Sequence, residues 1–89
     1  MSVQTMDVQK ILAAYLLENS SVVVSGEISP DENLLDGGIL DSLGIAELTE
    51  FIEKEFGIEV DEDEVSAKNY RSVQTLTQFC TSKIAERTA

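Results

Sequence analysis

The chain has 89 residues, enough for one domain built around a single hydrophobic core. Its formal net charge of −11 disfavours binding to nucleic acid or to an anionic membrane and favours partners with basic surfaces. Histidine is absent, which removes the commonest general base and metal ligand, and Cys80 is the single cysteine, so an internal disulfide is excluded.

The first periodic segment predicts a helix that Thr5 caps and that runs to about Leu17. Apolar residues recur at helical spacing along one side of this segment and should face the core. They are Val8, Ile11, Leu12, Tyr15 and Leu16.

Residues 18–40 are predicted to form a long connection, and connections of this length in compact domains are often functional. Ser29-Pro30-Asp31 indicates a turn within it. Val22-Val23-Val24 has the composition of a strand, but no second strand pattern exists to pair with it, so we predict an extended loop. Apolar residues should hold the loop across the helix ends: Ile28, Leu34, Leu35, Ile39 and Leu40.

A second helix is predicted over residues 42–56. Gly37-Gly38 supplies a turn before it, and Asp41 is a favoured N-cap residue because its side-chain oxygen can accept from a first-turn N–H. Gly57 stands where a helix C-cap is expected. The stripe predicted to be buried contains Ile45, Leu48, Phe51, Ile52 and Phe56.

Ser42 is predicted to face solvent at the start of this helix. At about 100° per residue it projects near Ala46 and Glu53, away from the buried stripe. Leu43 and Glu50 share this open side of the helix, with Glu47 and Lys54 beside them. The predicted site is therefore a serine at a helix start, with small or apolar neighbours and carboxylates one and two turns further on.

The rest of the chain predicts two more helices. Ser66 can cap a short helical turn through Tyr70, and Ser72 can cap the last helix. Cys80 lies in the apolar row of that helix and should be a small buried hydrophobe rather than a reactive thiol. The row contains Val73, Leu76, Cys80 and Ile84, with Phe79 at its edge. The predicted fold class is all-α, with three main helices, a short helix before the last, and a long loop between the first two.

Acidic residues are concentrated in the middle of the chain. Ten acidic residues lie between Asp41 and Glu64 against Lys54 alone, so this stretch carries −9 of the net charge. The acidic surface can be a solvated face or a docking surface for basic partners. A calcium site of the EF-hand type is not supported, because the register from Asp31 places Asp36 at the glycine position and Ser42 at the final glutamate position.

A longer motif surrounds Ser42. Leu40-Asp41-Ser42-Leu43-Gly44, then Glu47-Leu48 and Glu55-Phe56-Gly57-Ile58, resembles the signature of acyl and peptidyl carrier proteins. The resemblance covers most of the chain, about residues 6–84, and implies that the helices pack as a small four-helix bundle. It includes Leu34, Leu35, Asp36 and Gly38 before the serine and Asn69-Tyr70-Arg71-Ser72-Val73 after it.

The resemblance implies that Ser42 receives 4'-phosphopantetheine from coenzyme A through a phosphopantetheinyl transferase. It implies that Asp41 helps to position the metal-bound coenzyme A during transfer. The thiol of the attached arm would then carry acyl or aminoacyl thioesters from a loading enzyme to downstream synthases. The implied partner face, which would meet basic patches on these enzymes, consists of Leu43, Ala46, Glu47, Glu50 and Glu53.

In this interpretation the chain is not itself an enzyme and binds no metal of its own. A serine hydrolase is not supported, because Gly38-Ile39-Leu40-Asp41-Ser42 replaces a Gly-x-Ser-x-Gly elbow. No apolar run approaches the roughly 20 residues that span a bilayer, and no secretion signal is recognisable at the N-terminus, so a cytoplasmic monomer is expected. The whole chain, 1–89, is interpreted as one carrier domain with an ordered core at about 5–86.

Two residues depart from the pattern of fatty-acid carriers. The position of Glu50 is commonly apolar in those proteins, and Lys54 interrupts an otherwise acidic face. The departures favour a stand-alone carrier in a specialised pathway such as polyketide or nonribosomal peptide assembly. A fatty-acid carrier is the alternative within the family, and an unmodified carrier-fold docking adaptor is the alternative of another class. In some relatives the bundle shelters the cargo between its second and third helices.

Overall fold

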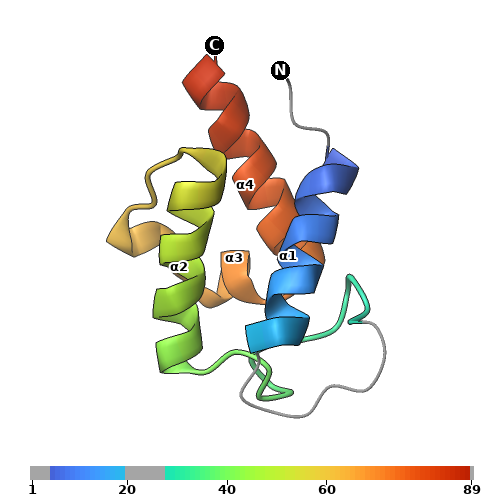
Figure 1. Ribbon diagram of the computed structural model, residues 1–89. Coiled ribbons are helices and arrows are strands. Elements are labelled where there is room, and N and C mark those ends of the chain that lie inside the picture. Colours follow the sequence, from blue (N-terminus) through green and yellow to red (C-terminus); the bar gives the residue numbers. More distant parts are fainter. Residues whose placement is uncertain (1–4, 20–27, 89) are drawn as a thin grey trace.

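The computed structural model describes residues 5–19 and 28–88 (Figure 1). These residues form helices, turns and loops but no strand. The elements are α1 (Thr5–Asn19), α2 (Ser42–Phe56), a 3₁₀ turn η1 (Glu62–Glu64), α3 (Ala67–Tyr70) and α4 (Val73–Thr88). The all-α prediction of three main helices with a short helix before the last is confirmed. Val22-Val23-Val24, predicted as an extended loop, lies outside the described residues.

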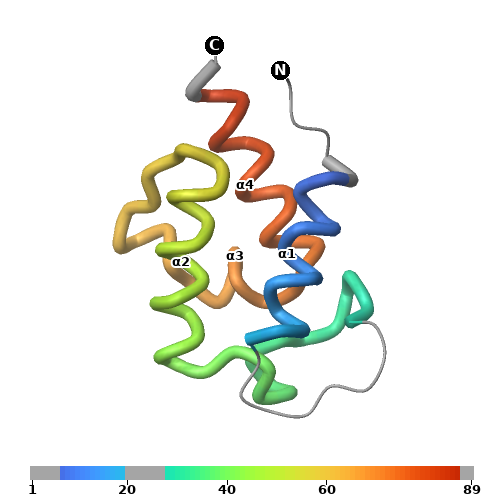
Figure 2. Tube along the Cα trace, viewed as in Figure 1, coloured from blue at the N-terminus to red at the C-terminus, as the bar shows by residue number. Residues whose placement is uncertain are grey.

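The three long helices surround one core, and α4 contacts each of the other three α-helices. The start of α1 and the end of α4 lie at one end of the bundle, and α2 begins at the opposite end (Figure 1). The chain then passes through η1 on the outer side of α2 and returns through α3 to the base of α4 (Figure 2). The start of α2 is therefore well separated from the start of α1.

The core contains the apolar faces that the helical periodicity predicted. From α1, Val8, Leu12 and Leu16 are buried, and Ile11 and Tyr15 are half-buried against them. From α2, the buried residues are Leu48, Ile52 and Phe56, with Ile45 and Phe51 half-buried. From α4, Val73, Leu76 and Cys80 are buried, and Phe79 and Ile84 pack beside them. Each helix therefore uses its apolar stripe to cover the same interior.

Tyr70 and Thr77 are buried in the core, which the sequence pattern did not predict. Tyr70 is buried although it belongs to the one-turn helix α3, which is too short to show a periodic stripe. Thr77 is buried within α4, where its hydroxyl donates to the carbonyl oxygen of Val73 at 2.7 Å. That bond satisfies the buried hydroxyl group inside its own helix, so a threonine is tolerated in the core.

Cys80 is fully buried in α4. Burial disfavours the thiolate and raises the pKa of Cys80 to about 12. The predicted role of a small buried hydrophobe is confirmed.

The described part of the connection before α2 is held against the end of the bundle. The backbone N–H of Gln74 donates to the carbonyl oxygen of Pro30 at 2.8 Å, and that of Leu34 donates to Arg71 at 2.7 Å. A turn at Ser29 is closed by the backbone N–H of Glu32 at 3.1 Å, as predicted. The predicted apolar anchors are confirmed: Ile28, Leu34, Ile39 and Leu40 are buried, and Leu35 is half-buried.

Candidate functional site

The turn that leads to Ser42 is organised by Asn33, which sequence reasoning missed. Its side-chain oxygen accepts from the backbone N–H groups of Leu35 at 3.1 Å and Asp36 at 2.9 Å. Asparagine side chains make such turns because they reach the backbone two or three residues ahead. Gly38 follows with φ of 76°, a conformation that strains any residue with a side chain, so the predicted glycine turn is present.

Asp41 caps the start of α2, as predicted. Its Oδ1 accepts from the backbone N–H of Gly44 at 2.7 Å, and its carbonyl oxygen accepts from that of Ile45 at 2.8 Å. A side chain on Gly44 would place its Cβ 3.1 Å from that Oδ1. Glycine at this position therefore leaves room for the short capping bond.

Ser42 is the first residue of α2, and it is exposed, as predicted. In the first turn of α2, the backbone N–H of Gly44 donates to the side chain of Asp41. The backbone N–H groups of Ser42 and Leu43 have no acceptor within the helix, because they belong to its first turn. These N–H groups and the positive end of the helix dipole favour a phosphate beside the Ser42 hydroxyl group.

A groove opens beside Ser42. It has a volume of about 550 Å³ and runs between α2 and the segment around η1. Its walls consist of Ser42, Ile45, Ala46, Thr49, Glu62 and Val65. The residues from α2 are spaced by three and four positions, so they form one strip of the helix surface. An elongated group attached to Ser42 would find this groove directly next to its attachment point.

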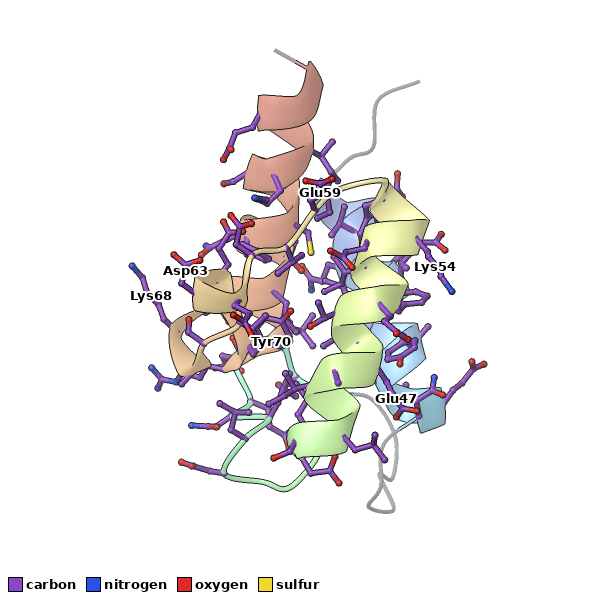
Figure 3. All side chains as sticks on the ribbon, turned by 90° about the vertical axis from the view of Figure 1, so that its left-hand side faces the viewer. Glu47, Lys54, Glu59, Asp63, Lys68 and Tyr70 are labelled. Carbon is purple, nitrogen blue, oxygen red and sulfur yellow. The ribbon has the colours of Figure 1, made fainter. Side chains whose placement is uncertain are left out.

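A hydroxyl pair joins α2 to α3 beside this groove. The hydroxyl oxygens of Thr49 and Tyr70 are 2.6 Å apart. Figure 3 shows Tyr70 between α2 and the α3 segment. Burial raises the pKa of Tyr70 above its ordinary value. Sequence reasoning missed this pair, because its two members lie in different helices.

The outer face of α2 carries most of the predicted partner residues. The Leu43 side chain is 68% exposed, which is unusual for a large apolar residue. Ala46, Glu47 and Glu50 are also exposed. Glu47 and Lys54 lie along the same flank of α2 (Figure 3). The exposed Leu43 therefore directly follows Ser42, and two exposed carboxylates lie further along the same helix.

Glu53, the remaining residue of the predicted partner face, has an intramolecular bond. It is half-buried, and its carboxylate accepts from the backbone N–H of Val60 at 3.0 Å. Gly57 lies between them with φ of 64° and ends α2, as predicted. The Glu53 carboxylate therefore holds the segment that leaves α2.

The acidic run after α2 forms the turn η1, which was not predicted. The Oε1 of Glu64 accepts from the backbone N–H of Asp61 and from the Nζ of Lys83, both at 3.0 Å. The Asp61 bond and, after it, the Lys83 bond lower the pKa of Glu64. The bond to Glu64 raises the pKa of Lys83. Across residues 5–19 and 28–88, no three acidic or cysteine side chains come together as metal ligands.

A protein family described as "Phosphopantetheine attachment site" matches residues 10–80 of the chain. The chain belongs to this family. Proteins of the family attach 4'-phosphopantetheine covalently, and the chain is a phosphopantetheine-binding carrier domain. No curated protein sequence shows significant similarity to this carrier domain.

A solved structure resembles the carrier domain over most of its length. It is the crystal structure of the Bradyrhizobium japonicum glycine:[carrier protein] ligase complexed with glycylated carrier protein. The similarity has a TM-score of 0.62 at 26% sequence identity, and it covers 83% of this chain and 95% of that chain. None of the helices in the described ranges is both long and apolar enough to cross a membrane.

The start of α2 in this carrier domain fits the prosthetic group of the family. Ser42 presents an exposed hydroxyl group at a helix N-terminus, which suits a phosphodiester. The groove beside it has a volume of about 550 Å³, which can hold part of an elongated arm.

Proposed function

We propose that Ser42 is the attachment site of 4'-phosphopantetheine and that the chain carries acyl or aminoacyl thioesters between enzymes in the cytoplasm. The observation that carries this proposal is the position of the Ser42 hydroxyl group. It is exposed at the first residue of a capped helix and borders a groove. When bound, the prosthetic group supplies a thiol that forms thioesters.

During attachment the chain supplies the nucleophile and its position. The Ser42 oxygen bonds to the phosphorus that bears the pantetheine part of coenzyme A, the pyrophosphate bond breaks, and adenosine 3',5'-bisphosphate leaves. The hydroxyl proton passes to a base of the transferase or to solvent. Asp41 fixes the helix start through its bond to Gly44, and we propose that its carboxylate also helps to position the metal-bound coenzyme A.

We propose that the chain performs no catalysis itself. It contains no histidine, so a serine–histidine pair cannot form within it. Its own thiol, Cys80, is fully buried with its pKa raised to about 12, so it is a poor nucleophile. Thioester chemistry is therefore left to the thiol of the attached arm.

We favour an aminoacyl or related cargo in a specialised biosynthetic pathway. The carrier in the similar structure is glycylated and bound to its ligase, which supports a comparable loading enzyme for this chain. Partners would contact the exposed Leu43 and the acidic residues Glu47 and Glu50 through basic patches. Ala46 lies within this face, and Glu53 contributes its charge at the edge while bonded to Val60.

Mass spectrometry tests the attachment site. The purified protein is incubated with coenzyme A, magnesium and a broad-specificity phosphopantetheinyl transferase. We expect the mass to increase by one phosphopantetheine, and Ser42→Ala to abolish the increase. Ser82→Ala is the matched control, because Ser82 is also an exposed helical serine, in α4. A folded wild-type protein that gains no mass would instead support the unmodified docking adaptor.

A further inference from the structure

A straight strip of exposed side chains runs along the outer face of α2. It consists of Leu43, Glu47, Glu50 and Lys54, which are spaced by four, three and four positions. At about 100° per residue these side chains project within about 60° of one another. Figure 3 shows Glu47 and Lys54 on the same flank of the helix. The α2 strip therefore begins next to Ser42 and extends almost to the end of α2.

The chemical character of the α2 strip changes along its length. Leu43 is apolar and 68% exposed, and the exposed carboxylates of Glu47 and Glu50 follow it. At a rise of about 1.5 Å per residue, these carboxylates are carried about 6 and 10 Å beyond Leu43 along the helix axis, and Lys54 about 16 Å beyond it. Between Asp41 and Glu64 the sequence contains ten acidic residues, and Lys54 is the one basic residue. The strip therefore passes from apolar to negative to positive with distance from Ser42.

The charged groups of the α2 strip form no ion pair within the described part of the chain. Glu50 and Lys54 are four positions apart, in the order that favours an ion pair on a helix. Across residues 5–19 and 28–88, however, the salt bridge that forms joins Lys83 to Glu64, and Lys54 takes part in none. The strip therefore presents both signs of charge to another molecule.

A change of sign along a docking face gives the face a direction. A uniformly acidic face attracts a basic surface in many orientations, whereas a cation at one end repels any basic group placed opposite it. A partner with basic groups opposite Glu47 and Glu50 gains further attraction only if a carboxylate faces Lys54. The reversed orientation brings basic groups against Lys54 and is disfavoured. An enzyme docked in the favoured direction keeps its apolar contact with Leu43, next to Ser42.

We propose that Lys54 is a positioning residue that orients the enzymes acting at Ser42. The partner surface contains an apolar pocket for Leu43, basic groups for the two carboxylates of the α2 strip, and a carboxylate for Lys54. This inference rests on the proposed function, which supplies the enzymes. It adds the residue that orients them and the order of charges on the surface that they present.

The first test measures kcat/KM of the phosphopantetheinyl transferase that modifies Ser42, with the full chain as substrate at low salt. Lys54→Glu is compared with Lys68→Glu, which makes the same charge change at an exposed position. Figure 3 shows Lys68 on the α3 segment, across the molecule from Lys54. We expect Lys54→Glu to lower kcat/KM roughly 3–10-fold, mainly through KM, and Lys68→Glu to leave it unchanged or slightly higher.

The direction of this effect is informative because Lys54→Glu makes the acidic face more acidic. Attraction to a basic partner without an orienting cation would raise kcat/KM in both variants. Lys54→Arg keeps the cation and should retain most of the wild-type value, and Lys54→Gln should lie between the wild-type protein and Lys54→Glu. High salt should reduce all of these differences.

A purely structural role of Lys54 is distinguishable. The residue lies in the last turn of α2, where a cation interacts favourably with the helix dipole. If that were its whole role, Lys54→Gln would lower the melting temperature and leave the kcat/KM of the folded protein unchanged.

The second test identifies the group that faces Lys54 and needs no change at that residue. A carbodiimide, which joins an amine to a carboxylate in direct contact, is added to Ser42→Ala protein mixed with the transferase and coenzyme A. Mass spectrometry should find an amide bond between Lys54 and an aspartate or glutamate of the transferase. Lys68 is the internal control and should form no such bond.

Each result separates the inference from the proposed function. Equal kcat/KM values for Lys54→Glu and Lys68→Glu, on wild-type protein that is modified at Ser42, would overturn the inference and leave the carrier role intact. Bonds from other lysines to the transferase without one from Lys54 would also overturn it. Failure of wild-type Ser42 to accept any arm would overturn the proposed function, and the inference with it.

Discussion

The backbone N–H of Leu34 donates a 2.7 Å hydrogen bond to the carbonyl oxygen of Arg71, which joins the loop before α2 to the junction of α3 and α4. A second bond nearby, from the N–H of Gln74 to Pro30 at 2.8 Å, connects the same two regions. The Leu34 side chain is also fully buried in the core, with 0% exposure. The placement of the segment that delivers Ser42 therefore depends on a residue eight positions before it in the sequence.

Leu34→Ala should destabilise the protein strongly. Removal of a fully buried leucine side chain leaves a cavity, and the free energy of unfolding should fall by about 2–4 kcal/mol. Denaturant unfolding followed by circular dichroism measures this change. Leu17→Ala is the control, because Leu17 is 39% exposed and its replacement should cost less than about 1 kcal/mol. Equal losses in the two variants would contradict the anchoring role of Leu34.

We expect Asp41 to have two effects: its side-chain oxygen stabilises the start of α2, and its negative charge speeds the attachment of the arm. Asp41→Ala removes the cap on Gly44 and should lower the free energy of unfolding by about 1 kcal/mol. Asp41→Asn keeps a capping oxygen and should retain most of the stability. If the carboxylate positions metal-bound coenzyme A, both variants should be modified roughly 10-fold or more slowly. A normal rate in Asp41→Asn would limit the role of Asp41 to capping.

Cys80 should be unreactive in the native protein. Its thiol is fully buried and its pKa is raised to about 12, so almost no thiolate is present at neutral pH. Ser42→Ala protein, which lacks the arm thiol, is treated with a disulfide reagent. We expect no labelling in buffer and complete labelling in denaturant. Fast labelling of the native protein would show that the α4 face around Cys80 opens readily.

The bonds of Glu64 should make stability depend on pH. Because its pKa is lower in the folded protein than the ordinary value of 4.5, the stabilisation is fully present above that value and is lost as the pH falls below it. Glu64→Gln should therefore lower the melting temperature by roughly 1–4 °C at pH 7, with the difference vanishing at low pH. Scanning calorimetry across this range measures the effect. A difference that persists at low pH would point to packing rather than charge.

The acidic face should guide partner docking. Glu47→Lys reverses an exposed charge beside Leu43 and should lower the kcat/KM of a basic loading enzyme by roughly 3–10-fold at low salt. Glu18→Lys makes the same charge change at an exposed position on α1 and is the control. Circular dichroism should be unchanged in both variants. If the two variants behave alike, net charge rather than the α2 face determines association.

The spacing of residues along the chain was sufficient to predict the helix α2 and the turn that precedes it. An α-helix completes one turn in about 3.6 residues, so apolar residues spaced by three and four positions lie on one face. The α2 helix could therefore be predicted without knowledge of the segments that pack against it. The cap at Asp41 and the turn at Gly38 depend only on residues within the same short segment, and the exposure of Ser42 was predicted from its position relative to the apolar stripe. Interactions of this kind are encoded by sequence spacing, and the structure contains each of them.

Tertiary structure alone decided which separate segments meet at the site. The Thr49–Tyr70 pair joins two helices, and the bond between Glu64 and Lys83 joins η1 to α4. Glu53 was predicted only as part of an outer face, yet its carboxylate bonds to Val60 beyond the end of its own helix. Helical periodicity tells which side of one element is apolar, but it contains no information on which neighbour covers that side. The groove wall next to Ser42 therefore emerges only when α2, η1 and α3 are packed together.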